Sequence, residues 1–372
     1  MEEGFLDEYD DQAENDAVSR LIDSANRLRS DASAVVLPSA LRINIIGKSN
    51  GVGLARDMRL LEEALRSCGH EVSTHAVDTV QIRRRRSLLS QSLVGLRRAC
   101  RKFGTPSRGT GIDISLMVEH VWPQFISQAS CNVVVPNPEW FDRNDLRFLP
   151  WTDGVWAKTQ LTAQIFRGLG RPTTFIGFDS DDRYQPQVPR ERRFFHLAGK
   201  SAMKSTERLV RLWASQPQWP TLTIVQHSPH LHAPEVRAAN IDRRCGYMDD
   251  EELKREQNAC MFHVCPSLTE GWGHYLVEAL SVGAVALTVD APPMNELVTP
   301  DRGLLVSYEA TGRQKLARTY YFSNAELRNA VESALTMTDA RWRELSLRAR
   351  AWFEANRAGF PERVRTALSQ LA

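Results

Sequence analysis

The stretch PSLTEGWGHYLVEALSVGAVALTVDAPPMNE, residues 266–296, is the part of the sequence that most clearly indicates the fold. Gly271 and Gly273 precede an apolar helical pattern that stops at Gly283, so the helix should begin with unobstructed backbone N–H groups. Such a helix start carries unbonded N–H groups and a partial positive charge, which suits a phosphate group. The β-branched run at residues 285–289 then predicts a buried parallel strand.

Two carboxylates belong to this stretch: Glu270 precedes the glycines, and Glu278 falls within the apolar helix. A carboxylate buried without a partner costs roughly several kcal/mol, so Glu278 should either reach solvent or have a dedicated partner. For Glu278 alone, a solvated helix edge and a functional role are equally good interpretations. The presence of Glu270 at the start of the same helix favours the functional role for Glu278.

This pattern resembles the C-terminal signature of the retaining GT-B glycosyltransferases of the family-four, or group 1, class, over about thirty residues. The resemblance implies an α/β fold in which two Rossmann-like, doubly wound domains face each other across a cleft. It also implies that Glu270 contacts the donor sugar and that Glu278 contacts the ribose of the nucleotide. The diphosphate would be held by the segment between them, Gly271, Trp272, Gly273, His274 and Tyr275.

Length and composition agree with two soluble domains. The 372 residues are 42% hydrophobic and 25% charged, with a net charge of +2. No apolar run approaches the ~20 residues that cross a bilayer, and the acidic N-terminus is unlike a signal peptide. Six scattered cysteines without a C-x-x-C pair indicate reduced thiols and a cytoplasmic protein. The predicted divisions are an acidic and helical extension (1–40), an acceptor-side domain (41–185), a nucleotide-sugar domain (186–345) and C-terminal helices that cross back to the first domain (346–372).

A strand at residues 41–46, the loop GKSNGVG and a helix at residues 54–67 form the expected opening of a doubly wound domain. The loop is neither a Walker A motif nor a Rossmann fingerprint, because arginines occupy positions 42 and 56, where glycine or alanine would be needed. The resemblance places Gly51 and Gly53 beside the donor phosphates; a plain tight turn is the alternative.

Residues 83–108 form the clearest charge anomaly, because arginines and lysines accumulate there without a single acid. Leucines recur beside them at helical spacing, which predicts a basic amphipathic helix suited to an anionic membrane surface or to nucleic-acid phosphates. A merely solvated face is an equally weighted alternative. We assign to the acceptor side Arg83, Arg84, Arg97 and Arg98.

Five further residues are candidates for the site. Asn137 and Glu139 end a predicted strand and could meet the acceptor, and the resemblance places His120 near the reacting sugar. A lone histidine is more often structural. The resemblance also implies a basic pair that neutralises the leaving diphosphate, here Lys200 and Lys204; lysine at the first position keeps the charge but loses the bidentate geometry of arginine.

The spacing of the two carboxylates argues against a glycosidase. Eight helical residues would separate Glu270 from Glu278 by roughly 12 Å, whereas a retaining glycosidase needs its carboxyl groups about 5–5.5 Å apart. We therefore expect transfer of a sugar from a nucleotide-diphosphate sugar with retention, without a cofactor. The Asp179-Ser-Asp181 sequence is not expected to bind a metal, because the resembled fold requires none.

The acceptor is the least constrained part of the prediction. A saccharide or lipid-linked acceptor at the cytoplasmic membrane face fits the basic segment and is common in the resembled family. A modified base in DNA is the alternative enzyme substrate. A third hypothesis is a non-catalytic sensor of sugar nucleotides, against which the intact pair of Glu270 and Glu278 argues.

Overall fold

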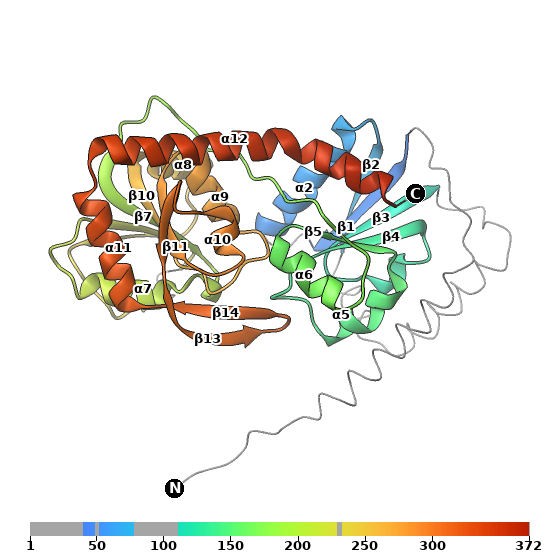
Figure 1. Ribbon diagram of the computed structural model, residues 1–372, viewed down its shortest axis with the longest axis horizontal. Helices are drawn as coiled ribbons and strands as arrows, with labels where there is room; N and C mark the ends of the chain where they lie inside the picture. The colour runs from blue at the N-terminus through green and yellow to red at the C-terminus, as the bar shows by residue number, and fades with distance from the viewer. Residues whose placement is uncertain (1–39, 49–51, 78–110, 229–232, 372) are drawn as a thin grey trace, which may run out of the picture.

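A computed structural model describes residues 40–48, 52–77, 111–228 and 233–371 of the chain. Two α/β domains lie side by side, and a long C-terminal helix runs along both of them (Figure 1). Each domain contains a six-stranded sheet whose strands all pair in parallel. The predicted architecture of two doubly wound domains is therefore confirmed.

Three neighbouring strands of the N-terminal sheet, at residues 42–48, 112–119 and 129–136, are short apolar runs whose middle residues are buried, as expected for parallel strands covered on both faces. Its strand order is β2 (Glu71–Val77), β1 (Arg42–Lys48), β3 (Ile112–Glu119), β4 (Ala129–Pro136), β5 (Gly154–Ala157) and β6 (Thr173–Phe175). Its described helices are α2 (Val52–Ser67), α5 (Arg143–Phe148) and α6 (Gln160–Gly168), with the short 3-10 turns η1 (Pro123–Phe125) and η2 (Leu149–Trp151).

The C-terminal sheet is similar, and its strands β10 (Cys260–Cys265) and β11 (Val285–Val289) are buried along their whole length. The strand order is β12 (Gly303–Val306), β11 (Val285–Val289), β10 (Cys260–Cys265), β7 (Glu191–Gly199), β8 (Leu222–Gln226) and β9 (Ile241–Cys245). Its helical segments are η3 (Ala202–Lys204), α7 (Thr206–Ala214), α8 (Asp250–Ala259), α9 (His274–Ser281), α10 (Met294–Leu297) and α11 (Asn324–Thr336).

The segment between β6 and β7 connects the domains and packs between them. Phe178 is fully buried there, with its ring centroid 5.1 Å from that of Phe360 and 6.1 Å from that of Trp272. The linker acids are held by arginines: Asp181 pairs with Arg56 and Asp182 pairs with Arg350. One apolar cluster consequently extends through both domains.

Helix α12 (Asp339–Ser369) begins on the C-terminal domain and ends on the N-terminal domain (Figure 1). The sequence predicts two helices here, at residues 341–358 and 361–371, with Pro361 at the start of the second. The structure instead shows one helix with Pro361 inside it. The Arg363 guanidinium donates to the main-chain oxygens of Asn356 and Ile176, which holds the helix together across the proline and against the linker.

A two-stranded antiparallel hairpin, absent from the sequence prediction, follows β12. Its strands are β13 (Tyr308–Gln314) and β14 (Ala317–Phe322), and it reaches from the C-terminal domain towards the N-terminal one (Figure 1). At its tip, the Leu316 N–H donates to Pro138 O at 3.2 Å, and nearer its base the Tyr320 N–H donates to Leu268 O at 2.8 Å. The hairpin is therefore hydrogen-bonded to one loop of each domain.

None of the helices in the described ranges is both long enough and apolar enough to span a bilayer.

Candidate active site

A cavity of about 420 Å³ opens between the domains at the carboxyl ends of both parallel sheets, the edge at which open α/β sheets bind ligands. The N-terminal domain contributes the start of α2 and the ends of β3, β4 and β5. The C-terminal domain contributes the segments that follow β7 and β10. The lining residues are Gly53, Leu54, Asp57, Glu119, Asn137, Glu139, Trp140, Lys158, Ser201, Lys204, Glu270, Gly271, Trp272, Gly273, His274 and Tyr275.

Helix α9 begins at this cavity with two glycines that the structure requires for different reasons. Gly273 has a φ of +86°, which favours glycine, and it caps the helix without a side-chain hydrogen bond. A Cβ on Gly271 would lie 2.3 Å from Asn137 Oδ1, so the other domain leaves no room for a side chain. Within the described residues, the N–H groups of His274 and Tyr275 donate no hydrogen bond. These two amides are available to an anion.

An acid and a base flank this helix start. Ser267 Oγ donates to Glu270 Oε1 at 2.5 Å. Lys204 Nζ donates to Leu197 O at 2.7 Å and lies 4.1 Å from the centroid of the Tyr275 ring. Burial lowers the pKa of Lys204, although the nearby Glu270 acts in the opposite direction. Burial likewise raises the pKa of Glu270, although Lys204 acts to lower it. Glu270 and Lys204 are therefore electrostatically coupled at the cavity.

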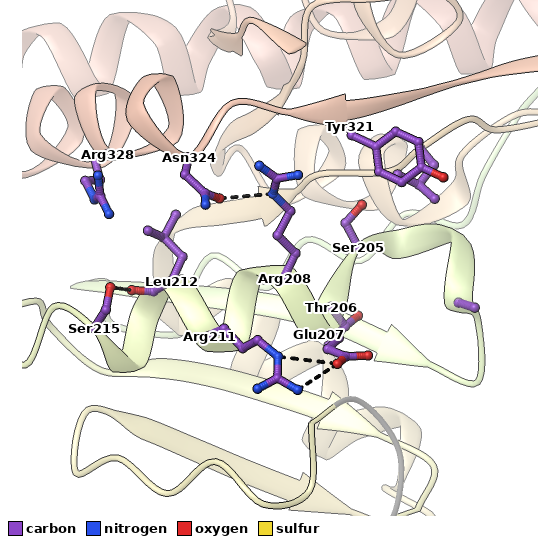
Figure 2. A pocket seen from close by; sticks show the side chains of 12 residues that line it. Ser205, Thr206, Glu207, Arg208, Arg211, Leu212, Ser215, Tyr321, Asn324 and Arg328 are labelled. Carbon is purple, nitrogen blue, oxygen red and sulfur yellow. Dashed lines mark hydrogen bonds and ion pairs between the residues drawn. The ribbon is translucent and has the colours of Figure 1, made fainter. Parts of the chain in front are cut away.

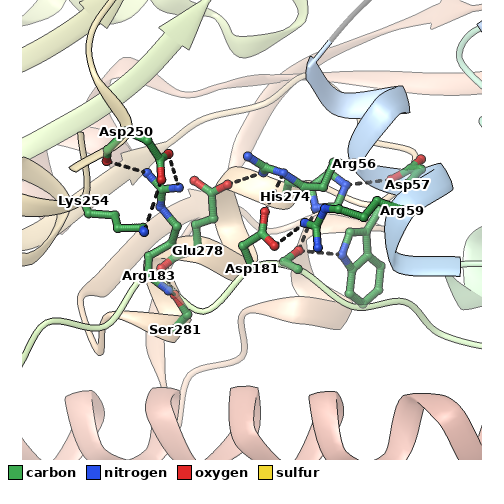
Figure 3. A network of polar contacts seen from close by, with 12 residues as sticks. Arg56, Asp57, Arg59, Asp181, Arg183, Asp250, Lys254, His274, Glu278 and Ser281 are labelled. Carbon is green, nitrogen blue, oxygen red and sulfur yellow. Dashed lines mark hydrogen bonds and ion pairs between the residues drawn. The ribbon is translucent and has the colours of Figure 1, made fainter. Parts of the chain in front are cut away.

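Glu278 is 1% exposed and has a dedicated partner instead of a path to solvent. Gln257 Nε2 donates to its Oε2 at 2.7 Å, and the Arg56 guanidinium from the N-terminal domain binds its Oε1. Arg56 Nε also lies 3.0 Å from Asp181 Oδ2 (Figure 3). Burial opposes ionisation of Glu278, but Arg56 reverses this effect, so the pKa of Glu278 is lowered overall. The carboxylate is therefore charged at neutral pH.

A chain of hydrogen bonds links the two domains along the cavity wall. His274 Nε2 lies 2.7 Å from Asp57 Oδ1, and Lys158 Nζ lies 2.9 Å from Asp57 Oδ2. On the other side, His274 Nδ1 lies 2.8 Å from Ser180 Oγ, which accepts from Trp272 Nε1 at 3.1 Å. A carboxylate only accepts, so Nε2 carries a proton and the Ser180 hydroxyl donates to Nδ1. Ser180 is 0% exposed, so this serine–histidine–aspartate chain is structural and contains no accessible nucleophile.

His120 is buried behind the cavity wall. Its Nε2 lies 3.0 Å from Lys48 Nζ, and its Nδ1 lies 2.9 Å from Asp145 Oδ2. An ammonium only donates, so Nε2 accepts and Nδ1–H donates to Asp145, which fixes one tautomer. The preceding residue, Glu119, lines the cavity with a left-handed φ of +69°, and its Oε2 lies 3.7 Å from Lys48 Nζ.

The loop after β4 forms the opposite wall. Asn137 and Glu139 are 8% and 6% exposed, whereas Trp140 is 43% exposed. Within the described residues, Asn137 Oδ1 and Glu139 Oε2 have no hydrogen-bond partner. Burial, reinforced by the carboxylates of Glu270 and Glu119, raises the pKa of Glu139 to about 8.

The family described as "Glycosyl transferases group 1" matches residues 243–334. This range includes helix α9 and the whole segment from Glu270 to Glu278. The matched region lies within the C-terminal domain and does not extend over the rest of the chain. No curated protein matches the chain in sequence.

Solved glycosyltransferase structures share the fold over most of the chain. Sucrose-phosphate synthase from Thermosynechococcus elongatus has a TM-score of 0.62 at 16% identity, covering 89% of this chain and 99% of its own. A glycosyltransferase from Rickettsia africae has a TM-score of 0.63 at 10% identity, covering 90% and 98%. Anabaena HepE in complex with UDP and glucose has a TM-score of 0.60 at 15% identity, covering 89% and 100%. The arrangement is therefore the GT-B fold predicted from the sequence.

The GT-B arrangement brings most of the sequence-predicted site residues together at the cavity: Glu270, Lys204, Gly271, Trp272, Gly273, His274, Tyr275, Gly53, Asn137 and Glu139. Lys200 is exposed and does not line the cavity, and neither do His120 and Glu278. The remaining predictions fall outside the described residues: Gly51, Arg83, Arg84, Arg97 and Arg98. The helical estimate of the spacing between Glu270 and Glu278 does not apply, because α9 begins only at His274.

Sequence reasoning missed several charged residues that the GT-B fold brings to the site. Asp57 and Lys158 line the cavity, and Arg56 neutralises Glu278. Lys158 follows the apolar strand β5, so its position at a carboxyl strand end was an available signal. Arg56 and Asp57 look like surface residues of an amphipathic helix in the sequence. They are sheltered only because the second domain packs against α2.

A larger hollow of about 560 Å³ lies outside the interdomain cavity, between α7, α11 and β14 (Figure 2). It contains three arginines, but two of them have acidic partners. Arg208 binds Glu309, and Arg211 binds Glu207 at 2.8 Å. This local neutralisation makes the hollow a weaker candidate for an anionic substrate than the interdomain cavity.

Proposed function

We propose that the protein is a retaining glycosyltransferase that moves a sugar from a nucleotide-diphosphate sugar to a hydroxyl group of a saccharide or lipid-linked acceptor. One observation carries the proposal: the two unbonded amides of His274 and Tyr275 open onto a cavity that also holds Glu270 and Lys204. Amides at a helix start bind a diphosphate, and a nearby ammonium stabilises the charge that develops on it during departure.

Each charged residue has a role in this reaction. The amides and Lys204 hold the diphosphate, and Glu270 orients the donor sugar. Glu278 accepts from the ribose hydroxyls, because each of its oxygens has a lone pair beyond the one used by Arg56 or Gln257. Lys204 and the helix amides supply positive charge at the leaving group, so the proposed mechanism includes no metal ion.

Structural similarity indicates which nucleotide sugars to test first as donors. Anabaena HepE has been solved with UDP and with UDP-glucose. Uridine diphosphate sugars are therefore the first donors to test, followed by those of guanine, thymine and adenine.

The chemistry of the N-terminal wall favours a saccharide over DNA as acceptor. The N-terminal wall of the cavity contains the acidic side chains of Glu119 and Glu139. These two side chains can hydrogen-bond to sugar hydroxyls but offer no positive charge to nucleic-acid phosphates. The basic segment 83–108 would hold the protein at an anionic membrane surface. Vesicle flotation and DNA retention across a salt series separate these two roles of the segment.

The proposal is tested by calorimetry with the donor panel, followed by product analysis. Binding of one nucleotide sugar, and an anomeric configuration in the product equal to that of the donor, are the expected results. Glu270→Ala should abolish transfer while circular dichroism stays unchanged. Inversion at the anomeric carbon would contradict retention, and tight nucleotide binding without turnover would support the sensor hypothesis instead.

A further inference from the structure

Glu139 differs from the other carboxylates that line the interdomain cavity. Asp57 is bound by Lys158 and His274, Glu119 faces Lys48, and Glu270 accepts from Ser267. Glu139 Oε2, by contrast, has no partner anywhere in the described part of the chain, although the residue is only 6% exposed. The neighbouring Asn137 Oδ1 is unpaired as well. Buried polar atoms are nearly always hydrogen-bonded, so these two point to a ligand that supplies the missing donors.

The position of this pair assigns the ligand to the acceptor side. Asn137 lies against the backbone of Gly271, at the start of the segment that binds the diphosphate in the proposed function. Trp140, two-fifths exposed, lines the same cavity and offers an aromatic face. A sugar ring can stack its C–H face on an indole while its hydroxyl groups donate to carboxylate and amide oxygens.

We propose that Glu139 is a catalytic residue that binds the reacting hydroxyl of a saccharide acceptor and takes its proton. This inference rests on the proposed function. As retention requires, the acceptor oxygen approaches the anomeric carbon from the side on which the diphosphate departs. As it bonds to that carbon, the bond from the carbon to the diphosphate oxygen breaks, and the diphosphate leaves with the bonding electrons. The acceptor proton passes to the Glu139 carboxylate, and then to solvent or to the departing phosphate. Charge and atoms balance without any further reactant.

The surroundings of Glu139 suit it to this proton transfer. The charged groups that face it are Glu270 from the segment before α9, Glu119 from the end of β3, and Lys158 from the end of β5. Burial raises the pKa of Glu139 to about 8, with help from the carboxylates of Glu270 and Glu119. The hydrogen bond from the Glu139 backbone N–H and the charge of Lys158 oppose this rise. A base works best when its pKa lies near the working pH, which this environment achieves.

The sign of the expected pH dependence follows from this environment. Only the ionised form of Glu139 can take a proton, so kcat/KM for the acceptor should rise about tenfold for each pH unit below 8 and level off above it. The Kd for the donor nucleotide should not show this pH-dependent rise, which is called the acid limb of the profile. A wild-type acceptor profile that is flat from pH 6 to 9 would overturn the proposal without any variant.

The direct test compares Glu139→Gln with wild type and with Glu256→Gln, a variant at a sheltered carboxylate that pairs with Arg193 and Arg244 outside the cavity. Glu139→Gln should lower transfer at least about 100-fold and remove the acid limb, while the Kd for the donor nucleotide stays unchanged. Glu256→Gln should keep the wild-type profile.

The outcomes separate the inference from the function on which it rests. If wild type transfers sugar and Glu139→Gln matches its rate and pH profile, the assignment of Glu139 is wrong and the proposed function stands. If wild type binds no nucleotide sugar, the proposed function fails and the inference fails with it.

Discussion

His274 Nε2 donates to Asp57 Oδ1 over 2.7 Å, and this hydrogen bond joins the first turn of α9 to α2 in the other domain. Asp57 also accepts from Lys158, which is only 1% exposed. Burial alone would raise the pKa of Asp57, but Lys158 and His274 lower it from 3.8 to about 2. The residues that shape the cavity are thus also residues that hold the domains together.

Asp57→Asn should therefore destabilise the protein. A carboxylate whose pKa is lower in the folded state stabilises that state above its unfolded pKa, and it loses this contribution as the pH falls through the folded pKa. The lowered pKa corresponds to about 2 kcal/mol, and the unpaired ammonium of Lys158 adds to the loss. Urea unfolding should show a decrease of about 2–4 kcal/mol at pH 7.

The pH dependence and a matched control sharpen this prediction. The difference between Asp57→Asn and wild type should be constant from pH 8 to 5 and should narrow below pH 4. Asp182→Asn removes a more exposed partner of Arg350 and should change the free energy of unfolding by less than about 1 kcal/mol. Equal stability of Asp57→Asn and wild type at pH 7 would contradict the proposed interdomain role.

Glu278→Gln should weaken nucleotide binding. The Arg56 guanidinium keeps the buried Glu278 ionised despite its desolvation, and a hydrogen bond from a ribose hydroxyl to a charged oxygen is worth about 1.5–3 kcal/mol. Calorimetry should therefore show a rise of about 10- to 100-fold in the Kd for the nucleotide. Asp250→Asn, at an exposed partner of Arg183 outside the cavity, should leave the Kd unchanged. Similar Kd values for both variants would exclude a ribose contact at Glu278.

The two lysines of the predicted basic pair should differ in their effects. Lys204 lies at the cavity next to Glu270, whereas Lys200 is exposed and outside it. Lys204→Ala should lower kcat by about 100- to 1,000-fold, because it removes charge stabilisation of the departing diphosphate. Binding of the free nucleoside, which lacks phosphates, should change little. Lys200→Ala is the matched comparison, and an equal loss of turnover in both variants would restore the original pairing.

The sequence carried strong local signals for the parts of the fold with regular periodicity. The glycine-punctuated start of α9 and the strand β11 were predictable because their apolar residues are continuous and their boundaries are marked by Gly273 and Gly283. Contacts between domains gave no such signal. Arg56 and Glu278 are 222 residues apart, and neither sequence neighbourhood indicates the other.

The hairpin was missed for a different reason. Its turn consists of Lys315 and Leu316, and Lys315 adopts a left-handed φ of +54° without the glycine or asparagine that usually marks a two-residue hairpin turn. Outward-facing β13 is also exposed along almost its entire length, so it lacks the alternating apolar pattern of a half-buried strand.

Leu316 links this hairpin to the acceptor side of the cavity. Its side chain packs on an apolar cluster of the N-terminal domain, and its N–H donates to Pro138 O, between Asn137 and Glu139. Near the base of the hairpin, Tyr320 bonds to Leu268, two residues before Glu270. The hairpin therefore sets the position of the loop that carries Asn137 and Glu139 relative to the donor side.

Leu316→Ser should accordingly impair use of the acceptor and spare the donor. Loss of the partly buried leucine contact should destabilise the position of the loop that carries Asn137 and Glu139 by about 1–2 kcal/mol. This corresponds to a rise of about 10-fold in the acceptor KM. The Kd for the nucleotide should not change, because α9 and Lys204 are untouched. Arg318→Ser, at an exposed position on β14 of the same hairpin, is the control. Steady-state kinetics with varied acceptor distinguish the two variants, and an unchanged acceptor KM in Leu316→Ser would show that the hairpin does not position the acceptor loop.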